Sequence, residues 1–322
     1  MIPYAIENEI VRSFRENREV PSDLALSDAN LFRVSLHIIL SIGRMLRQSR
    51  QRTDQMEKRI KDDGTIVTDL DSSVEDYAHR QFRRAFTHIN FLGEETGGCL
   101  SDTEPSVALD PIDGTRSFIA QDSTNAVSLS IFKNSRVILG FVMNPATGEI
   151  GYSLKDSPTR LIQLSCFGEE DSARELPSVK NDPHAGRIRV NLQPGRGHRK
   201  YEKLLKDAWH ERRINYVKSA GGSPALALLE AARGYYVYVH PWESKPATPF
   251  DLSAGIHLVE NAGGRVIRAD NRPVEAVGHR GLFIAGTDPS HLSKVLDILR
   301  PAAVVYHPRT DTALSDSCNA DQ

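Results

Sequence analysis

Two carboxylates stand close together after an apolar stretch of the chain. Asp110 and Asp113 flank a Pro-Ile pair and are followed by Gly114 and Thr115. Two carboxylates at this spacing repel each other unless a cation accompanies them. Mg²⁺ prefers oxygen ligands and commonly combines a few carboxylates with phosphate oxygens of a substrate. Together with the carbonyl oxygen of Ile112, the two side chains could therefore supply a metal shell.

The Gly-Thr pair that follows predicts the start of a helix. The unpaired N–H groups and the positive dipole end of a helix start attract phosphate, so a metal and this helix would hold the same anion. The alternative is that Asp-Pro-Ile-Asp-Gly forms a type I turn that only closes a strand. This stretch by itself leaves both interpretations open.

Two further acidic motifs widen the set. Glu94 and Glu95 end a predicted strand, and Asp251 stands at the start of a predicted helix. Each motif has an ordinary alternative, because paired glutamates often lie in a solvated loop and an aspartate is a frequent helix N-cap. Considered together, however, the motifs follow a recognisable order along the chain.

This order resembles that of the inositol monophosphatase family of metal-dependent, lithium-sensitive phosphatases. The shared motifs are Gly-Glu-Glu at 93–95, Asp-Pro-Ile-Asp-Gly-Thr at 110–115, an aromatic-Asp pair at 250–251 and an N-terminal motif at 63–71 that ends in Asp71. The resemblance covers about residues 30 to 300. It implies a phosphoric monoester hydrolase that depends on two or three Mg²⁺ ions in each active site.

The resemblance also implies a ligand set for these ions. Glu94, Asp110 and the Ile112 carbonyl would bind one metal, and Asp110, Asp113 and Asp251 would bind a second. Asp110 would bridge the two. In such a site the metals lower the pKa of a bound water and stabilise the leaving oxygen, so that water attacks without a phosphoenzyme.

Further roles follow from the same resemblance. Asp71 and Thr115, together with the ligand Glu94, match the catalytic positions that orient and activate the water. The amides of Gly114 and Thr115 match the phosphate cradle. Lys61 lies near a basic position on the substrate side, with a solvated surface lysine as the alternative.

The chain departs from the family pattern near its late aspartate. Phe250 replaces the usual tryptophan, and an apparent insertion occupies 243–249. Inositol-selective members carry a glutamate seven residues before this aspartate that binds substrate hydroxyls, whereas the strand expected at 235–240 has no carboxylate. Glu243 and Lys245 could substitute for it, with an ordinary surface loop as the alternative.

The identity of the substrate stays open. Arg116 and the Ser-Phe-Ile that follows it are closer to histidinol-phosphate and sugar-phosphate phosphatases than to the inositol enzymes. Arg116 could touch the substrate or be an exposed helix arginine. A small polyol or sugar phosphate is the first hypothesis, and histidinol phosphate or 3′-phosphoadenosine 5′-phosphate is the alternative within the family.

Two readings from other classes compete with a metal-dependent phosphatase. Haloacid dehalogenase-type phosphatases also use an Asp-Gly-Thr-like motif, but one residue separates their two aspartates, whereas here two intervene. A non-catalytic family member with a regulatory or ligand-binding role is the other possibility. Its cluster of buried acids would be destabilising unless a metal were bound.

The composition excludes several other classes of protein. The chain has 322 residues, of which 39% are hydrophobic and 25% charged, and a formal net charge of −2. This balance predicts neither nucleic-acid nor membrane binding. Three cysteines without a CxxC spacing predict neither a disulfide framework nor a cysteine zinc site. Because no apolar leader or 18-residue apolar run occurs either, we expect a cytoplasmic protein.

The expected elements then divide the chain. Ser27 or Asp28 could cap a buried helix over about 27–52, and a second helix is expected to begin near Asp71. A run of short strands from 89, with a hairpin turn at 144–148, completes an N-terminal α+β half at 27–185, in which the polar stretch 153–186 is a candidate junction or insertion. Alternating strands and helices, among them a helix at 252–261, form a C-terminal α/β half at 186–307. Residues 1–26 are an extension and 308–322 a mobile tail. The resemblance implies a layered α-β-α-β-α sandwich, of mixed α/β class, that forms a homodimer.

Overall fold

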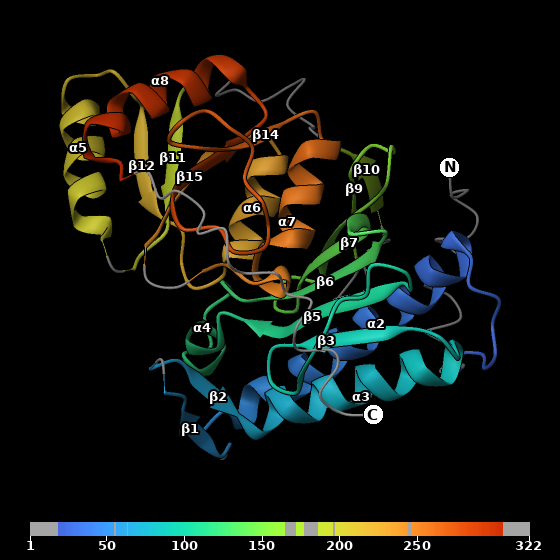
Figure 1. Cartoon of the computed structure of the whole chain (residues 1–322). Helices are drawn as coiled ribbons and strands as arrows, with labels where there is room; N and C mark the ends of the chain where they lie inside the picture. The colour runs from blue at the N-terminus through green and yellow to red at the C-terminus, as the bar shows by residue number, and fades with distance from the viewer. Residues whose placement is uncertain are drawn as a thin grey trace.

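Helices and sheets alternate in five layers in the computed structural model (Figure 1). The structure describes residues 19–304 apart from 55, 63, 165–171, 177–185, 196 and 244–245. Two helices cover the outer face of one sheet, two lie between the sheets, and two cover the outer face of the other. In that order they are α2 (Asp28–Ser49) and α3 (Asp69–Ala85), α6 (Pro224–Ala232) and α7 (Pro249–Asn261), and α5 (His198–His210) and α8 (Pro289–Leu299). The expected α-β-α-β-α sandwich is therefore confirmed.

The first sheet has eight strands in the order β10-β9-β8-β7-β6-β5-β3-β4. All neighbours are antiparallel except β3 and β5, which run parallel. The strands are β3 (Asn90–Gly93), β4 (Gly97–Gly98), β5 (Ser106–Asp113), β6 (Ala126–Lys133), β7 (Arg136–Asn144), β8 (Glu149–Leu154), β9 (Arg160–Gln163) and β10 (Ser172–Glu175). The hairpin predicted around 144–148 joins β7 to β8.

The second sheet has five strands in the order β12-β11-β13-β15-β14. β11 is parallel to β12 and β13, whereas β15 is antiparallel to β13 and β14. These strands are β11 (Arg189–Leu192), β12 (Tyr216–Ser219), β13 (Val237–Trp242), β14 (Arg265–Arg268) and β15 (Gly281–Gly286). A separate hairpin of β1 (Lys58–Ile60) and β2 (Ile66–Thr68) precedes α3.

α2 begins where the sequence predicts, because the Ser27 side chain accepts a hydrogen bond from the Asn30 N–H. Its apolar side chains are buried against the eight-stranded sheet. Among the described residues, Asp28–Arg52 is the one helical stretch long and apolar enough to suit a membrane span, yet 61% of its most apolar window is buried inside the protein. Such burial is typical of a core helix.

Three elements begin at residues other than those expected. α3 starts at Asp69 and not near Asp71, and α7 starts at Pro249 and not at Leu252. In both cases a threonine N-cap pairs with an aspartate three residues later, and this capping box sets the helix start. The strand expected from Tyr235 runs two residues later, as β13.

Two other expectations change. The segment 153–186 is not only a connection, because β9 and β10 add two strands to the edge of the eight-stranded sheet. Cys99 is disulfide-bonded, so the expectation of a chain without disulfides is wrong there. Both other cysteines, the extension to residue 18 and the tail from 305 lie outside the described residues.

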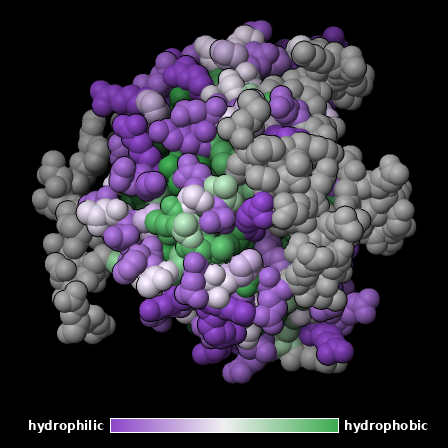
Figure 2. All heavy atoms as spheres, turned by 90° about the vertical axis from the view of Figure 1, so that its right-hand side faces the viewer, coloured by the Kyte–Doolittle hydropathy of each residue, from purple (hydrophilic) through white to green (hydrophobic). Residues whose placement is uncertain are grey.

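Hydrophobic side chains are exposed together on the side of the molecule that carries the β9–β10 edge (Figure 2). Figure 2 shows a cluster of hydrophobic surface on this side, with hydrophilic side chains around it. Isolated apolar side chains are normal on protein surfaces, whereas gathered ones are less common.

Candidate active site

The acidic run 110–113 forms the end of β5, in the middle of the molecule (Figure 1). Its pairing with β6 shifts between Asp110 and Asp113, as at a β-bulge, and both side chains are buried. The Oδ1 atom of Asp110 accepts a hydrogen bond of 2.9 Å from the Ile112 N–H. The alternative of a simple type I turn is therefore wrong. Bulges commonly redirect side chains next to active sites.

Asp113 is held from the other side of the fold. Its Oδ2 atom accepts hydrogen bonds from the Ser223 hydroxyl at 2.6 Å and from the Ala225 N–H at 2.7 Å. Ser223 is the N-cap of α6 and also accepts the Leu226 N–H at 3.0 Å. The first turn of α6 thus fixes the carboxylate of Asp113. Sequence reasoning identified this helix but not the role of Ser223.

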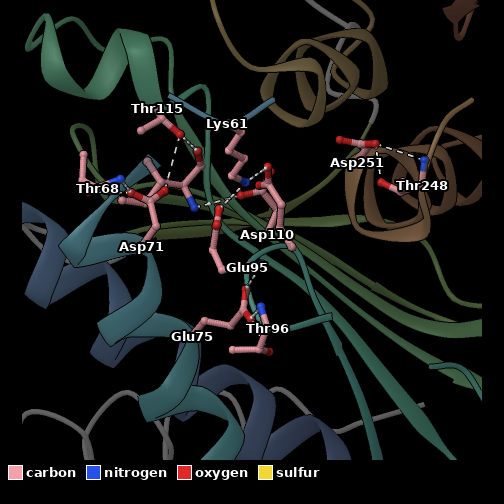
Figure 3. Close-up of polar contacts among 12 residues, drawn as sticks. Lys61, Thr68, Asp71, Glu75, Glu95, Thr96, Asp110, Thr115, Thr248 and Asp251 are labelled. Carbon is pink, nitrogen blue, oxygen red and sulfur yellow. Dashed lines mark hydrogen bonds and ion pairs between the residues drawn. The ribbon is translucent and has the colours of Figure 1, made fainter. Parts of the chain in front are cut away.

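The predicted helix after Asp113 is present as the short α4 (Thr115–Ile119). Gly114 caps it with a φ of 88°, and a Cβ there would lie 3.1 Å from the Gly222 carbonyl carbon and 3.1 Å from the Thr124 oxygen. Glycine is needed for both reasons. The Thr115 hydroxyl lies 3.1 Å from the Ile112 oxygen and 3.4 Å from Asp71 Oδ1 (Figure 3).

Asp71 is the third residue of α3 and closes its capping box with Thr68. Burial raises the pKa of Asp71 to about 6 even though the two hydrogen bonds from Thr68 lower it. The charges of Glu95 and Glu94 raise it further. The structure therefore brings Asp71, Thr115 and the glutamate loop to one place, as the resemblance implies.

Lys61 bridges the paired glutamates. Its Nζ atom lies 3.0 Å from Glu94 Oε1 and 2.6 Å from Glu95 Oε1 (Figure 3). Burial lowers the pKa of Lys61, but its bonds to Glu95 and Glu94 outweigh burial and raise it. The side chains of Glu94 and Glu95 are only 23% and 10% exposed. Neither a solvated lysine nor a solvated glutamate loop describes this arrangement.

A carboxylate that the motifs did not indicate supports this loop. Glu75 is fully buried on α3, and its carboxylate accepts hydrogen bonds from the Glu95 N–H at 3.0 Å, the Thr96 N–H at 2.7 Å and the Thr96 hydroxyl. It stands four residues after Asp71, and therefore on the same face of the helix. That spacing is the sequence signal that could have revealed it.

Asp251 begins α7 but is not its N-cap, so the N-cap alternative is wrong. Its Oδ2 atom accepts from the Thr248 N–H at 3.0 Å and from the Thr248 hydroxyl (Figure 3). The charge of Asp251 nevertheless acts on both β5 aspartates. α7 thus supplies the fourth acid of the cluster.

Burial and mutual repulsion raise the pKa values of the acids in this cluster. Burial raises the pKa of Asp110 well above its usual value, and Glu94, Asp113 and Asp251 add to this. Burial also raises the pKa of Asp113 to about 8, although Ser223 and Ala225 lower it. Carboxylates with such pKa values hold their charge only when a cation accompanies them.

The residues present fit a hard divalent cation by donor chemistry, because all the candidate ligands are oxygen atoms. Within the described ranges, however, no three acidic, histidine or cysteine side chains already converge as a closed metal shell. Each of three acids is hydrogen-bonded within the protein: Glu94 to Lys61, Asp113 to Ser223 and Asp251 to Thr248. The acids are close enough to shift one another's pKa values, but their oxygen atoms are not arranged around one point as metal ligands would be.

Two of the candidate substrate contacts, Arg116 and Glu243, are bonded to other groups of the protein. The exposed Arg116 donates to the Gly64 carbonyl at 2.8 Å, so it ties α4 to the turn of the β1–β2 hairpin. Glu243 is 17% exposed and pairs with Lys200 at 2.8 Å and the Tyr201 hydroxyl at 3.0 Å, so it is not an ordinary surface-loop side chain. Lys245 lies outside the described residues.

Comparison with known proteins adds to this geometry. The inositol monophosphatase family model matches residues 28–302. A Thermotoga maritima protein named fructose-1,6-bisphosphatase/inositol-1-monophosphatase is 26% identical over 82% of this chain and 94% of its own length. Inositol monophosphatase 2 of Mus musculus is 27% identical over 80% of this chain and 85% of its own.

Solved structures show the same fold. An IMPase from Thermotoga maritima superposes with a TM-score of 0.68 at 23% identity, covering 86% of this chain and 98% of that one. The extragenic suppressor protein SuhB of Bartonella henselae gives a TM-score of 0.67 at 19% identity, covering 84% and 98%. At these identities the superpositions establish the architecture.

Proposed function

Because the chain belongs to the inositol monophosphatase family, a family of metal-dependent phosphatases, we propose that it hydrolyses a small polyol or sugar phosphate with Mg²⁺. The chain is a phosphoric monoester hydrolase, as its family relatives are. The observation that carries the more specific proposal is the cluster of mutually repelling acids at the end of β5, whose pKa values are raised by burial and by one another.

The proposed metal ligands come from three separate elements. Glu94, Asp110 and the Ile112 carbonyl would hold one Mg²⁺, and Asp110, Asp113 and Asp251 a second. When bound, Mg²⁺ lowers the pKa of a coordinated water and offsets negative charge on the phosphate. The Lys61 ammonium lies 3.0 Å from Glu94 Oε1, so a metal held by Glu94 would share this carboxylate with Lys61 or compete with it.

The chain's own groups would orient the attacking water. The Thr115 hydroxyl can donate to Asp71 Oδ1 and accept from the water, since it lies within reach of Asp71 and the Ile112 oxygen. Asp71 would take up the water's proton through the Thr115 hydroxyl. Thr68 binds Asp71 Oδ2, which keeps Oδ1 directed at Thr115. The amides of Gly114 and Thr115 would hold the phosphate.

The substrate class rests on the relatives and not on Arg116. The matched proteins are named for inositol monophosphate and fructose 1,6-bisphosphate hydrolysis. The Arg116 motif does not separate sugar phosphates from histidinol phosphate, and its guanidinium donates to the Gly64 carbonyl. A polyol or sugar phosphate is therefore the proposal that the observations favour.

Phosphate release would test this function. The substrates are inositol-1-phosphate, histidinol phosphate, several sugar phosphates, fructose-1,6-bisphosphate and 3′-phosphoadenosine 5′-phosphate, each with and without Mg²⁺. We expect Mg²⁺-dependent release from a polyol or sugar phosphate, inhibited by Li⁺. Asp110→Asn should abolish release, because it removes the charge of the bridging ligand.

Asp156→Asn is the matched control, since Asp156 is exposed at 86% and has a φ of 57°, which asparagine tolerates. It should turn over like the wild type. A folded wild-type protein that binds Mg²⁺ but releases no phosphate from any of these substrates would contradict the proposal and favour a member without turnover.

A further inference from the structure

Thr124 lies between α4 and β6, directly behind Gly114. Its hydroxyl is 2.6 Å from Asp122 Oδ1, 2.9 Å from the Ser117 hydroxyl and 3.2 Å from the Gly222 nitrogen. A hydroxyl has one proton and two acceptor lone pairs. The Thr124 hydroxyl can donate its proton to Asp122 Oδ1 or to the Ser117 hydroxyl, and it accepts a hydrogen bond from the Gly222 N–H.

The turn that Thr124 holds has room only for glycine. Gly221 has a φ of 82°, and a Cβ there would lie 2.5 Å from the Thr124 Cβ. A Cβ at Gly222 would collide with the Ser117 hydroxyl. On its other side the turn is held by Gln193, whose Nε2 donates to the Gly221 carbonyl at 3.0 Å. The turn therefore rests directly on the segment that follows α4.

The same turn leads into the residue that holds Asp113. Ser223 follows Gly222 and donates to Asp113 Oδ2 at 2.6 Å. The Gly222 carbonyl carbon and the Ser223 nitrogen lie 3.1 and 3.2 Å from the position of a Cβ on Gly114. A shift of this turn would therefore move the support of Asp113 and the backbone behind Gly114 together.

We propose that Thr124 is a positioning residue for the active site, whose hydroxyl fixes the Gly221–Gly222 turn and, through Ser223, the carboxylate of Asp113. This role rests on the proposed function, since Asp113 is a ligand only if a metal binds there. The contacts of the hydroxyl are with Asp122, Ser117 and Gly222, so it would act on the site through Ser223.

Thr124→Val tests the role, because valine keeps the shape of threonine and removes only the hydroxyl. Residues that orient metal ligands typically contribute 10- to 100-fold to metal affinity. We expect the Mg²⁺ concentration for half-maximal activity, and the Kd of Mg²⁺ measured by calorimetry without substrate, to rise about tenfold. At saturating Mg²⁺, kcat should return close to the wild-type value.

Thr124→Ser is the matched rescue, since serine keeps the hydroxyl, and both Mg²⁺ values should be near those of the wild type. Thr103→Val, in an exposed loop, controls for the exchange itself. Thr124 is half-buried, so the variants should fold. Thr124→Ala provides the same test with a smaller side chain if valine does not fit.

Hydrogen–deuterium exchange of the metal-free protein gives a readout that does not depend on catalysis. Amides of 221–225 should exchange faster in Thr124→Val than in the wild type or Thr124→Ser. Unchanged exchange together with an unchanged Mg²⁺ Kd would overturn the role of Thr124, whatever the activity. A wild type that neither binds Mg²⁺ nor releases phosphate would instead overturn the proposed function, and this role with it.

Discussion

Glu75 shows how a single buried charge can organise the glutamate loop. Three donors from Glu95 and Thr96 satisfy its carboxylate, so the charge is compensated without a cationic side chain. The site at Gly93 has no room for a larger residue, because a Cβ there would overlap the Glu75 carboxylate. Glu75 therefore sets the backbone from which Glu94 projects.

Glu75→Gln should destabilise the protein and weaken Mg²⁺ binding. The amide NH₂ of glutamine cannot accept the hydrogen bonds that one carboxylate oxygen now receives, and a buried donor left unsatisfied costs about 1–3 kcal/mol. Urea unfolding with and without Mg²⁺ measures both effects. Glu104→Gln, at an exposed position, is the control. Equal unfolding midpoints for the wild type and Glu75→Gln would refute the role.

At the scale of elements, two helices begin with the same device. Thr68 and Asp71 start α3, and Thr248 and Asp251 start α7. In each, one carboxylate oxygen of a proposed site residue is bound to the cap. The capping box therefore fixes both where the helix starts and how the acid is directed. Asp71 keeps its other oxygen close to Thr115.

Thr248→Val should lower the free energy of unfolding by about 1 kcal/mol, as expected for a lost N-cap. It should also weaken Mg²⁺ binding, because Asp251 loses a donor that orients it. Thr248→Ser retains the hydroxyl and should behave like the wild type in both denaturant unfolding and Mg²⁺ titration. If serine and valine weakened the protein equally, the hydroxyl would not be the cause.

The whole molecule contains buried histidines that link its stability to pH. Burial lowers the pKa of His257 on α7 and of His279 before β15 to about 4 each. A histidine whose folded pKa lies below its unfolded value of roughly 6.5 stabilises the protein above pH 6.5, and this contribution is lost as the pH falls through 4. The raised pKa values of Asp71 and Asp113 act in the opposite direction in the metal-free protein.

A single substitution separates these opposing effects. His257→Gln removes one titrating ring, so the stability difference between the wild type and this variant should fall by roughly 2–3 kcal/mol from pH 7 to pH 4.5. The carboxylates are common to both proteins and cancel. Urea unfolding of metal-free protein at both pH values measures the difference. A difference that does not change with pH would mean that His257 titrates normally in the folded state.

The sequence by itself determined the local features of this protein. The Ser27 cap and the apolar spacing of α2, the 144–148 hairpin and the order of acidic motifs are set by residues close to one another in the chain. The layered fold followed from the family resemblance that those motifs carry. The N-caps Thr68 and Thr248 were missed, although each capping box consists of residues only three positions apart in the sequence.

Only the tertiary structure decided which distant groups complete the site. Ser223 reaches Asp113 across 110 positions, and Thr124 reaches Gly222 across 98. Lys61 meets Glu94 because the turn between β1 and β2 folds against the loop that follows β3. Such contacts depend on how layers stack and on strand register, to which sequence spacing gives no access. Local sequence patterns determine where helices and strands form. The pKa values of the site acids depend instead on burial and on contacts between distant elements, which only the folded chain provides.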